Sequence, residues 1–522
     1  MRVRVVFALL LVLFVATVAR MVSRDRVAHT VAAPAPSPKG TASAAGDAGV
    51  IDGSAPASSA AGATRDGGPV KWMDRPLRAV TLGWDLAAPA VLANGGLDPA
   101  EASDFSAAGV ETYVHPLEGM GAIEGALARG GGDREGADIA VVPFAELCAS
   151  YERLRALRPE VFFVVGWSRG REALVSTRDA LPSSAGPPGG PGVSAVAGGA
   201  RAGADPFSMV GAPGEAATFL GLFALDANGI PPGAVHLVAH PDKPDVPELA
   251  AVDRDAPGES ARRTVLLTTA DASRLVPFVA VAQRGLLDAH GPAFVAWTRV
   301  WLEATRKLDA DPPAAARAIA AAPGAPEPIA LLKRLGEMAP ASLGDNARAF
   351  GLSGRGALTL DALFQQTWRI WRGVGALATP APDAAPVHDA VVAALARAYP
   401  SLTTPAASPR PRPPAPSPDT LKVLVTYRQG EGKVDEAALL ATTGLLADVF
   451  ERSVLRVAVL KAGSVDAAAT KHLVEQVGLR FDVAPDRLVQ AKKAPVKAGG
   501  AGGLGGAPPL TSGATVEILV AP

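Results

Sequence analysis

The stretch Val161 to Thr177, VFFVVGWSRGREALVST, decides the fold because it is compatible with two exclusive structures. Residues 161–165 are apolar and mostly β-branched or aromatic, which is typical of a strand buried on both faces. The next residues, Gly166 to Gly170, are either a loop between two strands or the G-x-S-x-G turn that carries a serine nucleophile into a helix. Residues 172–177 look extended rather than helical, so the sequence favours the loop.

The composition limits the classes of function. The chain has 522 residues, enough for two or three domains, and its 50 basic and 51 acidic residues argue against a nucleic-acid partner. Cys148 is the single cysteine, which excludes an intrachain disulfide and a cysteine-rich metal cluster. The one close histidine pair, His236 and His240, has no carboxylate at helical spacing. We therefore expect no metal site and no cofactor.

The N-terminus is expected to direct export. Val5 to Ala19 is apolar and follows Arg2 and Arg4, which matches a secretory signal, and it is short for a membrane span of about 20 residues. Residues 1–22 are therefore a signal peptide or an inner-membrane anchor, and either places the remaining chain in the periplasm or cell envelope. A cytoplasmic protein that begins with an apolar helix is the alternative. Residues 23–70, rich in Ala, Ser, Pro and Gly, are predicted to be a disordered tether.

Strands alternate with helices from Leu77 onward, which predicts parallel β-α-β units. Ligands of such sheets lie beyond the carboxyl ends of the strands. The residues that the pattern places there, and that are our first candidates for ligand binding, are Trp84, Asp85, His115, Pro143, Phe144, Trp167 and Ser168.

Three segments of this region, TLGWDLAAPAVLANGGL, EGADIAVVPFAEL and VVGWSRGREALV, resemble the first lobe of periplasmic solute-binding proteins of ABC transporters. They are most similar to the SsuA-like class, which binds sulfonates, nitrate or thiamin precursors, and Arg274 to Leu308 is the most specific match. The resemblance implies an α/β, two-lobed, type 2 periplasmic-binding-protein fold over residues 71–402. Lobe one would take about 77–171 and 275–400, and lobe two about 172–270. It also implies a non-enzymatic protein with a small-molecule solute and an ABC transporter permease as partners.

On this interpretation, residues 172–177 cross into lobe two and the chain returns near Thr269 to Ser273. A low-complexity insertion at 181–203 is expected to be a solvated loop. Gly211 and Ala212 lie between a predicted strand at 207–210 and a predicted helix, so free backbone N–H groups would favour an anionic ligand there. An ordinary tight turn explains the same residues equally well.

Two other functions remain as alternatives. The first is a serine esterase that uses Gly166 to Gly170, which would need a histidine base and an acid near Ser168. Arg169, Arg171 and Glu172 put bulky charges where that fold packs small residues, which argues against it. The second is a structural cell-envelope protein whose cleft has lost its ligand.

The C-terminal part is predicted to be a separate domain. The segment TPAASPRPRPPAPSP lies in a stiff linker at 403–419, and 420–522 follows as an α+β domain with β-α-β-α-β-β order. With DVAPDRLVQA and VEILV, this order resembles the OmpA-like domain that binds peptidoglycan. The family holds diaminopimelate with an aspartate and an arginine. Here the region that carries the aspartate in the family is shortened to Lys461 to Ser464. Counting back from Gly478 puts Asp466 at the place of the arginine. We therefore expect a degenerate domain, with peptidoglycan binding doubtful.

Overall fold

The computed structural model describes most of the chain after residue 70. The described residues are 71–176, 193, 207–239, 249–253, 264–353, 356–403, 422–430, 434–492 and 512–520. The predicted export signal, tether, low-complexity insertion and Pro-rich linker lie outside them, apart from Val193, which is buried, and Thr403. No helix within the described ranges is long and apolar enough to cross a membrane. The structure below belongs to one compact unit, Gly67–Pro522.

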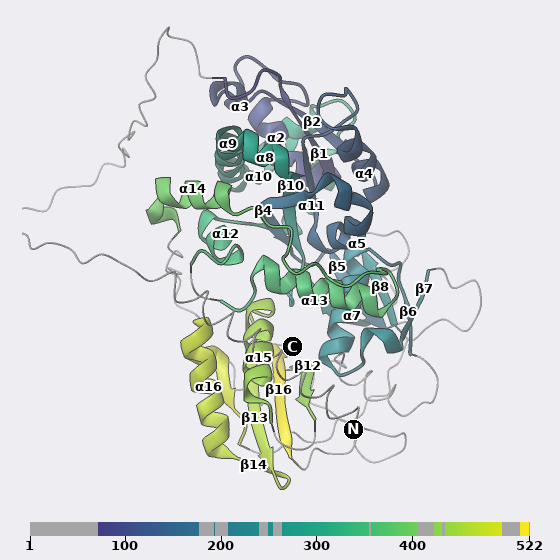
Figure 1. Ribbon diagram of the computed structural model, residues 1–522, viewed down its shortest axis with the longest axis vertical. Helices are drawn as coiled ribbons and strands as arrows, with labels where there is room; N and C mark the ends of the chain where they lie inside the picture. Colours follow the sequence, from purple (N-terminus) through teal and green to yellow (C-terminus); the bar gives the residue numbers. More distant parts are fainter. Residues whose placement is uncertain are drawn as a thin grey trace, which may run out of the picture. The chain divides into compact units, whose positions relative to one another are not determined.

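The first sheet has six strands in the order β11-β4-β10-β3-β1-β2 (Figure 1). Strand β1 pairs in parallel with β2 and β3, whereas β10 is antiparallel to both β3 and β4. Strand β10 follows the whole second sheet in the sequence, so the chain returns to the first sheet to form it. The strands are β1 (Leu77–Leu82), β2 (Thr112–Leu117), β3 (Ile139–Pro143), β4 (Pro159–Ser168), β10 (Pro277–Gln283) and β11 (Met338–Pro340).

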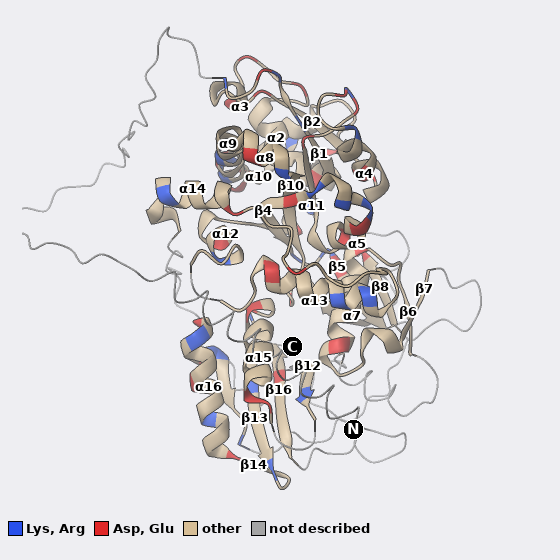
Figure 2. Cartoon of the chain, viewed as in Figure 1, with Lys and Arg blue, Asp and Glu red and all other residues tan. Residues whose placement is uncertain are grey.

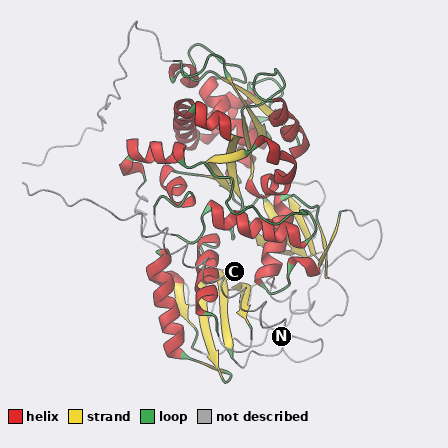
Figure 3. Ribbon diagram, in the orientation of Figure 1, coloured by secondary structure: helices red, strands yellow, loops and turns green. Residues whose placement is uncertain are grey.

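Helices surround this sheet (Figure 3). They are α2 (Trp84–Asn94), α3 (Asp104–Ala107), α4 (Met120–Arg129), α5 (Phe144–Leu154), α8 (Arg284–Ala289), α9 (Gly291–Ala310), α10 (Pro312–Ala320), α11 (Pro328–Gly336), α12 (Leu343–Ala349) and α14 (Ala390–Ala398). The apolar residues of α9 recur at helical spacing and are buried in the core. Trp297 is fully buried and lies 6.2 Å from Phe105 and 5.9 Å from Phe162 between ring centroids.

The second sheet has five strands in the order β7-β6-β8-β5-β9. Strand β5 is antiparallel to β8 and β9, and β6 is parallel to β7 and β8. The hydrophobic helix α7 (Ala216–Ala227) is almost completely buried and packs on β5 and β8. The strands are β5 (Glu172–Ser176), β6 (Phe207–Val210), β7 (Val235–Val238), β8 (Leu249–Asp253) and β9 (Thr264–Thr268).

The chain crosses between the sheets twice. It leaves β4 after Ser168 and enters β5 at Glu172, and it returns from Thr268 at the end of β9 to Pro277 at the start of β10. The two-lobed α/β fold that the resemblance implies is therefore confirmed. We call the part built on the first sheet lobe one and the part built on the second sheet lobe two. Since a strand follows Ser168, residues 166–170 do not form a turn into a helix.

Helix α13 (Leu360–Gly373) joins the lobes. Its Trp371 indole N–H donates a 2.9 Å hydrogen bond to the carbonyl of Ala145 on α5, in lobe one. The same ring lies 6.0 Å from Phe219 on α7, in lobe two. Arg369 adds an ion pair to Asp226 at the end of α7. These contacts hold one helix against both lobes.

The third sheet forms the C-terminal domain, with the order β12-β16-β13-β14 and with β15 parallel to β13. Its elements are β12 (Lys422–Gln429), α15 (Glu436–Val449), β13 (Val454–Lys461), β14 (Ser464–Val465), α16 (Ala467–Phe481), β15 (Leu488–Gln490) and β16 (Gly513–Val520). This is the β-α-β-α-β-β order read from the sequence, with the short β14 added. The OmpA-like resemblance itself stays a prediction.

The correspondence of Asp466 with the arginine of the family stays a prediction. Gly478 lies inside α16, and the C-cap of that helix, Asp482, has a left-handed φ of 57°. Asp466 is the N-cap of α16, where its Oδ1 accepts a 3.0 Å hydrogen bond from the Ala469 N–H.

Candidate functional site

A buried hydrogen-bond network connects the two segments that cross between the lobes, residues 168–172 and 268–277. Both the Ser168 and Thr269 hydroxyls donate to the Glu172 carboxylate, the second at 3.0 Å, and Thr269 Oγ1 also accepts a 2.8 Å hydrogen bond from the Gly170 N–H. Ser168, Glu172 and Thr269 are each at most 4% exposed. The sequence GWSRG therefore supplies a crossing segment in which the Ser168 hydroxyl and the Gly170 N–H are hydrogen-bonded within the protein.

The network also bears on the esterase alternative. Burial raises the pKa of Glu172, while the Ser168 hydrogen bond, the charge of Arg171 and the Thr269 hydrogen bond oppose that rise. Among the described residues, the hydrogen-bond partners of the Ser168 hydroxyl are Glu172 and Thr269. A serine nucleophile needs an imidazole in that position. In this geometry the Ser168 hydroxyl stabilises the segment that crosses between the lobes.

We expect the Ser168→Ala variant to lose about 1 kcal/mol of unfolding free energy, because Glu172 keeps its hydrogen bond from Thr269. Urea unfolding measures the change. Release of an activated ester, if any occurs, should be the same in both proteins. An ester hydrolysis that disappears in Ser168→Ala would contradict this assignment.

A chain of ion pairs runs between the lobes beside this network. Arg171 Nη1 lies 2.7 Å from Asp85 Oδ2 on α2, in lobe one, and its Nε lies 3.5 Å from Asp253 Oδ2 at the end of β8, in lobe two. Arg334, on α11, reaches Asp253 at 3.2 Å. The side chains of Arg171 and Asp85 are 18% and 8% exposed. A partly accessible guanidinium is thus held where the chain changes lobes.

The surroundings keep Arg171 charged. Burial lowers its pKa, but the charges of Asp85, Glu172 and Asp253 outweigh that effect and raise it. Its hydrogen bond to Asp85 uses Nη1, which leaves the Nη2 edge without a hydrogen-bond partner among the described residues. An arginine fork that carboxylates orient in this way can bind an anionic group.

Glu146, on α5 of lobe one, lies against the N-terminus of α7 in lobe two. Its carboxyl accepts a hydrogen bond from the Ala216 N–H. Burial raises the pKa of Glu146 to about 7; the Arg171 charge and the Ala216 hydrogen bond oppose this rise, whereas the Glu172 and Glu215 charges add to it. A carboxyl of the chain itself therefore occupies the helix N-terminus at which the sequence predicted an anionic ligand.

Of the candidate residues, Asp85 is part of the ion-pair chain, and Trp84 and Ala212 keep some exposure. Pro143 is buried, and Phe144 is fully buried with its ring 6.5 Å from Phe364, so neither offers a surface to a solute.

Trp167, Ser168 and Gly211 are engaged within the fold. Trp167 is 6% exposed and lies 3.9 Å beneath the Arg274 guanidinium. The Gly211 N–H, expected to be free, donates a 3.1 Å hydrogen bond to Val238 O, and the adjacent turn is followed by α7.

Sequence reasoning did not select Arg171, Asp253, Arg334 or Glu146. Two of them carry a visible signal, since Arg171 precedes a buried strand and Glu146 interrupts the apolar stretch VVPFAELC. Charged residues of both signs are otherwise interspersed over the described helices (Figure 2). Within the same ranges, no group of three or more His, Cys, Asp or Glu side chains could hold a metal ion.

No protein-family model matches this chain, and no curated protein matches it. Solved structures similar to it include the periplasmic aliphatic sulphonate-binding protein SsuA of Escherichia coli. The identity is 13%, the match covers 59% of this chain and 92% of that one, and the TM-score is 0.39. A putative periplasmic sulfonate-binding protein of Methylobacillus flagellatus gives 11% identity, coverages of 63% and 96%, and a TM-score of 0.40. The ligand-binding component of an ABC-type import system from Staphylococcus aureus, with zinc bound, is 13% identical. The match covers 61% of this chain and 98% of that one, and the TM-score is 0.38.

Proposed function

We propose that this protein captures a small solute between its two lobes and delivers it to an ABC transporter permease. The observation that carries the proposal is the position of Arg171, which Asp85 of lobe one and Asp253 of lobe two hold at the crossing. Small-molecule sites combine concave surface with a few convergent polar groups, and domain boundaries are frequent places for them. A solute that contacts both lobes would bind the closed arrangement better and so stabilise it.

The chemistry of these groups favours a solute with an anionic head group. Arg171 has an unused edge for a sulfonate, carboxylate or phosphate oxygen. Because its pKa is about 7, Glu146 is partly protonated near neutral pH, and the protonated carboxyl can donate a hydrogen bond to such an oxygen. Trp84 and Ala212, which keep some exposure, remain candidate contacts beside Asp85.

The remaining organisation is part of the same proposal. Residues 1–22 export the chain and residues 23–70 tether a solute-binding domain at 71–402. The linker at 403–419 leads to an OmpA-like domain at 420–522, without the usual peptidoglycan clamp. The protein would act in the periplasm or at the inner membrane.

A thermal-shift screen with taurine, alkyl sulfonates, nitrate, phosphate and pyrimidines, followed by calorimetry, tests the proposal. We expect Arg171→Lys to bind the best of these compounds about tenfold more weakly or worse, because lysine lacks the guanidinium fork. Arg299→Lys is the matched control, since Arg299 pairs with Glu303 at 3.2 Å on the outer part of α9. Equal affinity in wild type and Arg171→Lys would refute this binding site.

A structural role in the cell envelope is the second candidate. It is favoured by the fact that Asp85, Arg171, Asp253 and Arg334 already form ion pairs with one another. Absence of a thermal shift with every compound in the screen would support that role instead.

A further inference from the structure

The C-terminal domain contacts lobe two through a buried polar pair. Asn228 lies at the C-terminal end of α7, and its side-chain oxygen accepts a 3.0 Å hydrogen bond from the Thr426 N–H on β12. Asn228 is 5% exposed and Thr426 is 9% exposed. A buried hydrogen bond of this kind is lost when the two elements separate, which opposes their separation.

The same domain contacts the lobe-one side through the last turn of α15. Asp448 accepts hydrogen bonds from the backbone N–H groups of Ala357 at 2.6 Å and Leu358 at 2.9 Å, in the segment between α12 and α13. Its other oxygen lies 3.1 Å from Arg348 on α12. Asp448 is 8% exposed, which makes this a specific contact rather than a solvated surface pair.

The return crossing lies between these two contacts. Arg274 pairs with Glu451 of the C-terminal domain and with Asp345 of α12, both at 2.9 Å. Its backbone N–H donates to Val449 O at 3.2 Å, and its guanidinium covers the ring of Trp167 at 3.9 Å. A segment that must move when the lobes rotate is thereby attached to the C-terminal domain.

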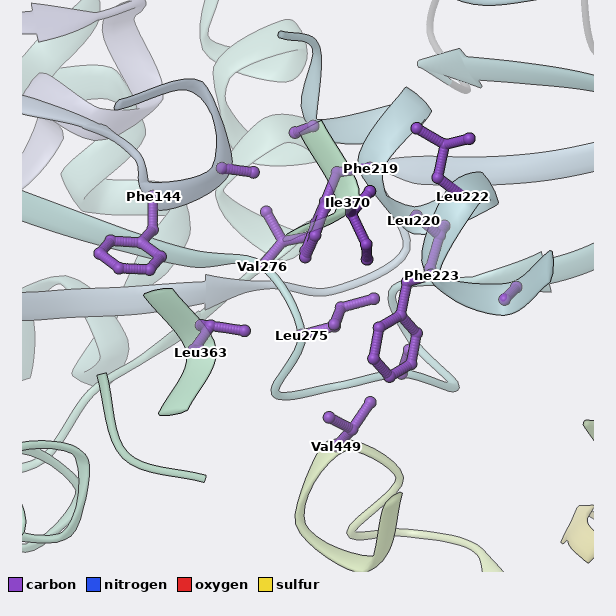
Figure 4. Close-up of a cluster of buried hydrophobic side chains, with 14 of the residues drawn as sticks. Phe144, Phe219, Leu220, Leu222, Phe223, Leu275, Val276, Leu363, Ile370 and Val449 are labelled. Atoms are coloured by element: carbon purple, nitrogen blue, oxygen red, sulfur yellow. The ribbon is translucent and has the colours of Figure 1, made fainter. Parts of the chain in front are cut away.

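Apolar packing follows the same path. Figure 4 shows Val449 below Leu275 of the return crossing and Phe223 of α7, with Leu363 of α13 nearby. All four side chains are at most 3% exposed and belong to one hydrophobic cluster. A cavity remains at this joint, lined among others by Trp167, Arg274, Leu358 and Glu451, so the packing there is less complete than in a domain core.

We propose that the C-terminal domain is a brace that holds the two lobes at one angle, so that the lobes move apart only when the domain leaves Asn228 and the segment at Ala357. The brace acts on the lobe movement that solute capture would use, and in that sense it rests on the proposed function. Its test needs no solute, so a failed ligand screen and a failed brace are separate results.

Spin-label distance measurements on the full chain test the brace. The labels are placed at Ala128 on α4 and His236 on β7, both exposed, in a Cys148→Ala background that removes the buried native thiol. The labelled protein without further substitutions should give one narrow distance distribution. The double variant Asn228→Ala with Asp448→Ala should give a broader one with a second population at longer distance.

Asp435→Ala is the matched control. Asp435 also accepts hydrogen bonds from two backbone N–H groups, those of Ala437 and Ala438, at the opposite end of α15. Its loss should leave the distribution narrow. Amide exchange of Arg274, whose N–H donates to Val449 O, reports separately on undocking, because neither substitution removes that acceptor. Faster Arg274 exchange in the double variant together with an unchanged narrow distribution would overturn the brace, as would broadening in the control.

Discussion

Replacing Trp371 with alanine is expected to lower the free energy of unfolding by about 3–5 kcal/mol. Trp371 is fully buried, and its ring fills the space between α5 of lobe one and Phe219 of lobe two. Alanine would leave a large cavity there and would also remove the hydrogen bond to Ala145 O. Urea unfolding followed by circular dichroism measures the loss.

Two further variants separate packing from hydrogen bonding. Trp371→Phe keeps most of the ring volume and removes the indole N–H, so it should cost about 1–3 kcal/mol. Trp72 provides the control, since its indole N–H also donates to a carbonyl, that of Ala108 at 3.1 Å, but the residue is 42% exposed. Trp72→Ala should therefore change stability much less. A similar loss at both tryptophans would show that α13 does not join the lobes through its core contacts.

The sequence predicts much of the fold because its apolar patterns are local. The buried run in β4, the extended residues that became β5 and the apolar face of α9 each carry their signal within one element. The two crossings followed from the resemblance rather than from periodicity. Contacts between distant residues carry no comparable signal. The carboxamide of Asn346, for example, bonds to both the N–H and the carbonyl of Val164 on β4, at 2.7 and 2.9 Å.

The candidate site shows the same limit. The order of strands and helices predicts where ligands approach an α/β sheet, and Asp85 was selected on that ground. It does not predict that Asp85 will meet Arg171, or that Arg334 will reach Asp253, since these pairs form only once both lobes have folded. Desolvation likewise depends on the packing of the folded chain, so the raised pKa of Glu146 has no counterpart in the sequence.

The stability of Glu146→Gln relative to wild type should rise by about 3 kcal/mol between roughly pH 4.5 and pH 8. The folded state raises the pKa of Glu146 from 4.5 to about 7, so between these values it binds more protons than the unfolded state. Wild-type stability from this group is therefore complete below its unfolded pKa and is lost as the pH rises through 7. Glutamine does not titrate, so the Glu146→Gln variant loses no stability from this position over that pH range. Urea unfolding of both proteins across this pH range measures the difference.

Glu124→Gln, on neighbouring α4, should behave in the opposite way. The hydrogen bond from Arg153 lowers the pKa of Glu124, so its contribution is present at neutral pH and is lost as the pH falls through the lowered value. The cost of Glu124→Gln should therefore be larger at neutral than at acid pH. A Glu146→Gln curve parallel to wild type would show that water reaches Glu146 in the folded protein.

The same measurement links Glu146 to the brace. Its carboxyl faces Arg171, Glu172 and Glu215 and accepts from the α7 N-terminus, and burial is the main cause of its raised pKa. Opening the lobes would hydrate the carboxyl and return its pKa toward 4.5. In the Asn228→Ala and Asp448→Ala background, the pH-dependent difference between glutamate and glutamine at position 146 should therefore shrink. If the full difference persisted there, Glu146 would be buried by its own lobe, and its pKa would carry no information about closure.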